Sequence, residues 1–118
     1  MLANGNPSLN LFGEKGELRA VLGLAPLRES TPHLSLFDEE GKVRAALSML
    51  PDGSPGFALY DEKGNTRAGV AVSADGPGMA LCDENGTVRT AIGATEEKRS
   101  ESSLLLCDEE GKVMWEAP

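Results

Sequence analysis

Apolar and polar positions alternate in short runs along this chain, and four of the runs lead into an acidic turn of the form Asp-Glu-x-Gly. Alternation with a period of two predicts β-strands. Asp at the first turn position and Gly at the fourth are typical of a type I turn followed by a left-handed residue. The pattern therefore predicts five β-hairpins, with the sequences LNLFGEKGELRAVLGL, LSLFDEEGKVRAALSM, FALYDEKGNTRAGVAV, MALCDENGTVRTAIGA and LLLCDEEGKVMWEA.

The five units form one tandem array, so we predict a single all-β repeat domain over residues 1–118. Successive marker glycines, from Gly16 to Gly111, lie 25, 23, 22 and 25 residues apart. Linkers of turn-forming composition separate the units, and surface connections of this kind tolerate changes in length. One hairpin buries too little to fold alone, so each unit depends on its neighbours. The units cover approximately residues 7–26, 33–50, 56–74, 78–95 and 103–118.

The hairpin register has two solutions that place different side chains on each face. With a four-residue loop, Leu34 and Leu36 share a face with Leu47, and Phe37 lies on the other. With a three-residue loop and a G1 bulge, Phe37 joins Leu47, while Leu34 and Leu36 join Arg44. The sequence does not decide between them, because a slip of one residue exchanges the two faces.

Neither face of the predicted sheet is fully polar, and an antiparallel meander leaves its edge strands open. We therefore expect the core to be completed by self-association, for example as a trimeric prism or stalk. The alternative is a β-solenoid or propeller-like arrangement. In a solenoid Cys82 and Cys107 would be about 5 Å apart, whereas in a meander they would be about 10 Å apart and unable to form a disulfide.

Two charged positions change at the ends of the array. Gly13 replaces the turn Asp in the first unit, and Met114 replaces the Arg of the second strand in the fifth. This offset suggests that each Arg pairs with the Asp of the following unit, and that Trp115 caps the last unit. The alternative is that each Arg is solvated and that Asp is present only because it favours the turn. The predicted pairs are Arg19 with Asp38, Arg44 with Asp61, Arg67 with Asp83 and Arg89 with Asp108.

The composition and charge of the chain argue against two classes of binding partner. The net charge is −8 with eleven basic residues spread along the chain, which argues against nucleic acid and anionic membranes. The chain contains no apolar run of the roughly 20 residues that a membrane helix needs and no signal-peptide pattern. It begins in a linker-like stretch, ANGNPSL, which is compatible with a fragment of a longer surface or virion protein. The two cysteines are expected to be buried thiols.

No motif in the chain points to catalysis, a metal or another cofactor. The acidic turns lack the alternating ligands of an EF-hand loop. His33 is the only histidine, and it is not accompanied by a nucleophile motif. Phosphate-binding glycine motifs are also missing. We therefore expect a protein that is not an enzyme and binds no cofactor.

One column of side chains precedes the turns and is a candidate binding stripe. It consists of Phe12, Phe37, Tyr60, Cys82 and Cys107. The alternative is a packing column, which the two cysteines favour. In layout, the pattern LxLaDExGxxRaxl is similar to tandem β-hairpin repeats of bacterial and phage-like proteins, and more loosely to MORN or choline-binding repeats. The resemblance implies a hairpin array. Two functions are consistent with it: a structural or interaction module that forms a homo-oligomeric stalk, fibre or scaffold, or a monomeric ligand-binding module, for example for carbohydrate, that uses Phe12, Phe37 and Tyr60.

Overall fold

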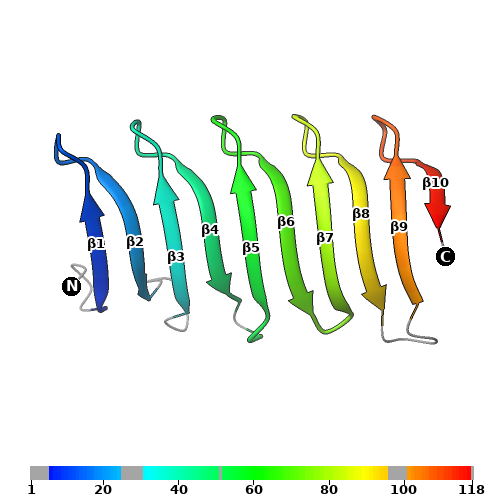
Figure 1. The fold of residues 1–118 in the computed structure, drawn as a ribbon, viewed down its shortest axis with the longest axis horizontal. Coiled ribbons are helices and arrows are strands. Elements are labelled where there is room, and N and C mark those ends of the chain that lie inside the picture. The colour runs from blue at the N-terminus through cyan, green and yellow to red at the C-terminus, as the bar shows by residue number, and fades with distance from the viewer. Residues whose placement is uncertain (1–5, 25–30, 51, 96–100, 118) are drawn as a thin grey trace.

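A computed structural model describes residues 6–24, 31–50, 52–95 and 101–117. Ten strands follow one another in a single antiparallel sheet whose spatial order is the order along the chain. Figure 1 shows the turns that join the two strands of each hairpin along one long edge of this sheet. The strands are β1 (Ser8–Phe12), β2 (Leu18–Leu24), β3 (Pro32–Phe37), β4 (Val43–Met49), β5 (Pro55–Tyr60), β6 (Thr66–Ser73), β7 (Gly76–Cys82), β8 (Val88–Thr95), β9 (Glu101–Cys107) and β10 (Val113–Ala117).

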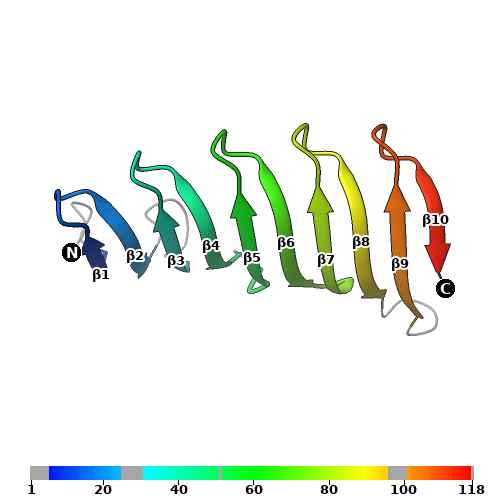
Figure 2. The ribbon, with the colours of Figure 1, turned by 45° about the horizontal axis from the view of Figure 1, so that its top comes forward.

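The predicted all-β array of five hairpins is therefore confirmed. The solenoid or propeller-like alternative is wrong, because consecutive strands are antiparallel neighbours and the sheet is open, with β1 and β10 at its edges. Figure 2 shows that the described strands form one layer, which turns gradually from β1 to β10. A twist of this kind is normal for an open sheet.

Each acidic turn is a three-residue loop with a G1 bulge. In the second unit, the Asp38 amide donates to the Lys42 carbonyl at 2.9 Å, and the Gly41 amide donates to the Asp38 carbonyl at 3.1 Å. Gly41 has a φ of 80°, a conformation that only glycine adopts without strain. This explains why the fourth turn position is glycine in every unit.

A second bulge follows each turn, in the second strand of the hairpin. The G1 bulge moves the side chains of that strand to the opposite face, and the second bulge moves them back. Phe37 pairs with Val43, but the preceding Leu36 pairs with Ala45, so that Arg44 is an extra residue in the second strand. The loop therefore matches the predicted three-residue register. Leu34 and Leu36 nevertheless share a face with Leu47, as the four-residue register predicted. The equivalent bulge residues in the other units are Arg19, Arg67, Arg89 and Met114.

The register gives the sheet one face of large apolar side chains, which we call the apolar face. Two long rows run across its strands, and a third, farther from the turns, contains Leu24, Pro32, Met49, Pro55, Val72, Pro77 and Ala94. The large row contains Leu9, Leu22, Leu34, Leu47, Phe57, Val70, Met79, Ile92 and Leu104. The alternating row, nearer the turns, contains Leu11, Ala20, Leu36, Ala45, Leu59, Ala68, Leu81, Thr90, Leu106 and Trp115.

The opposite face carries mostly Gly, Ala and Ser, and we call it the small-residue face. Beside the turns it also has a row in which Phe12 pairs with Leu18, Phe37 with Val43, Tyr60 with Thr66, Cys82 with Val88 and Cys107 with Val113. Two further rows follow from the same pairings. One contains Ser8, Gly23, His33, Ser48, Gly56, Ala71, Gly78, Gly93 and Ser103, and the other contains Asn10, Val21, Ser35, Ala46, Ala58, Gly69, Ala80, Ala91, Leu105 and Glu116.

A single chain has almost no hydrophobic core. Val21 is the one buried hydrophobic residue in the described part of the chain. The accessible surface is 8449 Å², whereas a compact protein of this mass exposes roughly 6,100 Å². The radius of gyration is 17.0 Å, against about 13.5 Å for a compact chain of this length. The described chain thus forms a single layer, whereas a stable domain normally packs two layers against each other.

Candidate functional site

The four bulge arginines join neighbouring hairpins. Nε of Arg44 donates to the carbonyl of Tyr60 in the next unit at 3.0 Å, and its Nη1 lies 3.6 Å from Oδ2 of Asp38 in its own unit. A planar guanidinium suits this double role because its donors form a rigid fork. The same forward hydrogen bond is made by Arg19 to Phe37 (3.3 Å), Arg67 to Cys82 (3.0 Å) and Arg89 to Cys107 (2.9 Å).

The ion pairs differ from those predicted. Each Arg was expected to pair with the Asp of the following unit, but Arg67 pairs with Asp61 and Arg89 with Asp83, within their own hairpins, each at 3.7 Å. The predicted pairs Arg19–Asp38, Arg44–Asp61, Arg67–Asp83 and Arg89–Asp108 are therefore wrong. The physical reason is the second bulge, which turns the guanidinium toward its own turn, while the residue it reaches in the next unit is the one before the Asp.

The first unit replaces its missing Asp with a different carboxylate. Glu17 accepts the Lys15 amide at 3.1 Å, as Asp38 accepts the Glu40 amide in the next unit. It also pairs with Arg19 at 3.4 Å. A Cβ at position 13 would collide with the Glu17 carboxylate, so Gly13 leaves the space that Glu17 fills. At the other end, Met114 lies on β10, after which the described sheet has no further strand.

The backbone holds the Asp38 carboxylate ionised. The Lys42 amide, followed by that of Glu40, lowers the pKa of Asp38 below its ordinary value of 3.8, against the opposing effect of desolvation. A lowered pKa in the folded state stabilises the fold above pH 3.8, and this contribution disappears as the pH falls through the folded-state pKa.

We predict that Asp38→Asn, which keeps an acceptor oxygen but cannot ionise, loses stability at pH 7 and not at pH 2. The gap in melting temperature between the natural chain and the variant should shrink as the pH falls from 5 to 2. Circular dichroism melts across this range measure it. A gap that is constant, or that widens toward pH 2, would contradict the assignment.

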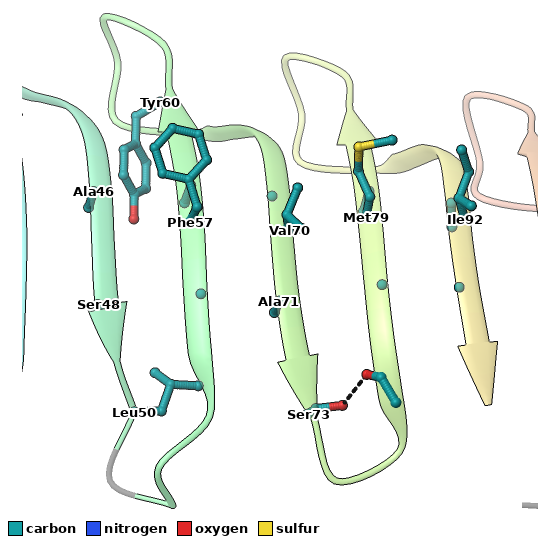
Figure 3. A pocket seen from close by; sticks show the side chains of 18 of the residues that line it. Ala46, Ser48, Leu50, Phe57, Tyr60, Val70, Ala71, Ser73, Met79 and Ile92 are labelled. Atoms are coloured by element: carbon teal, nitrogen blue, oxygen red, sulfur yellow. Dashed lines mark hydrogen bonds between the residues drawn. The ribbon is translucent and has the colours of Figure 1, made fainter. Parts of the chain in front are cut away.

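The candidate binding column lies beside the turns on the small-residue face. Phe12 is exposed, while Phe37, Tyr60, Cys82 and Cys107 are half-buried. Tyr60 borders a shallow trough of about 620 Å³ over β4 to β9, which is floored by residues such as Ala58 and Gly69. Figure 3 shows the trough with Tyr60 near its turn end and Leu50 and Ser73 near the other. Small side chains such as those of Ala58 and Ala80 leave this space above the strands.

The remaining candidate groups are dispersed. Cys82 and Cys107 are free thiols on β7 and β9, half-buried rather than buried as expected. His33 lies on the small-residue face of β3. Among the described residues, no three His, Cys, Asp or Glu side chains gather in a way that could hold a metal ion. The described part of the chain also contains no helix that could span a membrane.

Comparison with known protein families and curated proteins found no match. No protein-family model matches the chain, and no curated protein matches it.

The feature that the sequence analysis missed is the pairing that builds the large row and the alternating row of the apolar face. A signal for it was present: the first strand of each unit has Leu two residues before the turn Asp or its equivalent, and the second strand has Ala or Thr after the Arg in units one to four. Placing these positions opposite each other required knowledge of the second bulge.

Proposed function

We propose that this chain is a non-enzymatic structural module that completes its hydrophobic core by self-association through the apolar face. The observation that carries the proposal is the exposure of large side chains on that face. Leu9, Leu47 and Val70, for example, are 60%, 48% and 47% exposed in the single chain. Continuous apolar surface on this scale marks an interaction site.

The repeat architecture supports a stalk, fibre or scaffold as the role of the assembly. The units add along the 48 Å dimension of the sheet, so the number of hairpins sets the length. The bulge arginines link each hairpin to the next through backbone carbonyls, and such bonds hold the spacing of hairpins whatever the turn sequence is.

Folding coupled to association makes stability depend on protein concentration. A tenfold increase in concentration should raise the melting temperature by roughly 2–4 °C for a dimer of this size. Calorimetry between 5 and 500 μM measures this shift. A melting temperature independent of concentration, in a chain that unfolds cooperatively as a monomer, would contradict the proposal.

A second candidate function is a monomeric ligand-binding module, and the trough beside Tyr60 is the observation that favours it. An aromatic ring at the rim of a shallow groove suits flat ligands such as sugars. Glycan-array binding that is lost in Tyr60→Ala would support this function. Silence on such an array, together with an unchanged assembly in Tyr60→Ala, would dismiss it.

A further inference from the structure

On the basis of the self-association proposed above, we propose that the partner is one second copy of the chain, packed apolar face to apolar face and running antiparallel along the long dimension of the sheet. The two-fold axis runs parallel to the strands and passes between β5 and β6. In this arrangement β1 faces β10 of the second copy, and β5 faces β6.

The alternating row is the observation that selects this arrangement. Its odd-numbered strands contribute leucine, as with Leu36 and Leu59, and its even-numbered strands contribute Ala or Thr, as with Ala45 and Ala68. Neighbouring strands lie about 4.8 Å apart, so a leucine stands roughly every 10 Å with a gap between. A surface of this form is complementary to a copy of itself displaced by one strand.

The antiparallel two-fold provides that displacement without any shift of the sheet. Because the sheet has ten strands, the axis places every odd strand opposite an even one. Leu59 then opposes Ala68 of the partner subunit, and Leu81 opposes Ala45 of the partner subunit. The axis lies along the strands, so the large row faces the large row and the alternating row faces the alternating row.

Arrangements in which the copies run parallel do not use this complementarity. A two-fold or three-fold axis along the long dimension brings each strand against the same strand of another copy. The alternating row of one copy then faces the large row of the other. On odd strands its leucines oppose further large side chains, and on even strands its alanines leave gaps. Packed interiors tolerate neither voids nor overpacking well.

The area of the apolar face is sufficient for a stable dimer. The molecule measures 48 × 28 Å in outline, turns included, so two facing copies would cover at most about 2,700 Å² in total, within the range of obligate dimers. Facing sheets cross at about 30°, so their corners diverge. Trp115, on β10 where the other even strands of this row carry Ala or Thr, is large enough to fill such a corner. In this dimer, Trp115 would cap the last unit by packing between the two sheets.

Cysteine cross-linking tests the orientation. In a Cys82→Ser, Cys107→Ser background, Ala45→Cys and Leu81→Cys are made separately and together. Facing sheets pack about 10 Å apart, farther than a disulfide spans, so a bifunctional thiol reagent about 10 Å long is used in place of oxidation. Within one chain these positions are three strands apart, about 14 Å, beyond the reach of the reagent. We expect the reagent to yield cross-linked dimer from the double variant and from a mixture of the two single variants. Either single variant alone should yield about tenfold less. The pair Leu36→Cys and Thr90→Cys repeats the test on β3 and β8.

The mass of each sample before the reagent is added separates the two proposals. Efficient cross-linking of either single variant with itself, or a trimeric mass, would overturn the antiparallel dimer and leave self-association standing. A folded monomer of 12.4 kDa that does not cross-link would overturn both.

Discussion

Leu59→Glu is expected to abolish self-association and cooperative folding. Leu59 is 42% exposed in the single chain, and a change at such a surface position normally alters stability by less than about 0.5 kcal/mol. In the proposed assembly, the same side chain is buried at the centre of the interface. An unpaired carboxylate there costs several kcal/mol, more than a thin, two-layered protein can lose. Light scattering and circular dichroism measure the two effects.

Ala58→Glu is the matched control. Ala58 is the preceding residue on β5 and lies on the small-residue face, opposite Ala46 and Gly69. It receives the same charge with room to reach solvent, so the assembly should persist. Equal behaviour of the two variants, whether both associate or both remain monomeric, would show that the apolar face has no special role.

Arg67→Met is expected to lower the free energy of unfolding by about 1–2 kcal/mol, the range for a charge-assisted hydrogen bond reduced for partial solvent exposure. The substitution removes the forward bond to Cys82 and the ion pair with Asp61. Methionine is the residue that the chain itself carries at the equivalent position 114, where the described sheet ends. Urea titration monitored by circular dichroism gives the change in unfolding free energy.

Lys63→Met controls for the loss of one positive charge on the same turn. It should change stability by no more than about 0.5 kcal/mol, as is usual for surface positions. Arg67→Lys keeps the charge but not the fork of donors, so it should lose most of the stability that Arg67→Met loses. Full stability in Arg67→Lys would mean that charge alone matters and that the link between hairpins is not specific.

The hairpins were predictable because turn chemistry is local. A type I turn with a G1 bulge favours Asp at position 38 and needs Gly at position 41, whatever the sheet around them does. The same reasoning could not choose the register, because the second bulge at Arg44 looks in the sequence like an ordinary strand residue. Its consequence, that Leu36 and Leu47 share a face despite a three-residue loop, depends on backbone pairing.

The partners of the arginines were not predictable for a related reason. The loss of Arg at position 114 correctly suggested a contact with the following unit. However, the acceptor is a backbone carbonyl, such as that of Tyr60, and every residue offers one. A sequence shows differences between side chains but not between backbone carbonyls, so the predicted partner of Arg44 was the Asp61 side chain. The carboxylate of Glu17 was overlooked in the same way, because it takes the place of an Asp from a different position in the turn.

The mass of the chain in solution tests the central claim, self-association through the apolar face, most directly. Sedimentation equilibrium at micromolar concentration should give about 25 kDa, twice the 12.4 kDa of one chain, and Leu59→Glu should not reach that mass. A cooperatively folded species of 12.4 kDa would contradict the account.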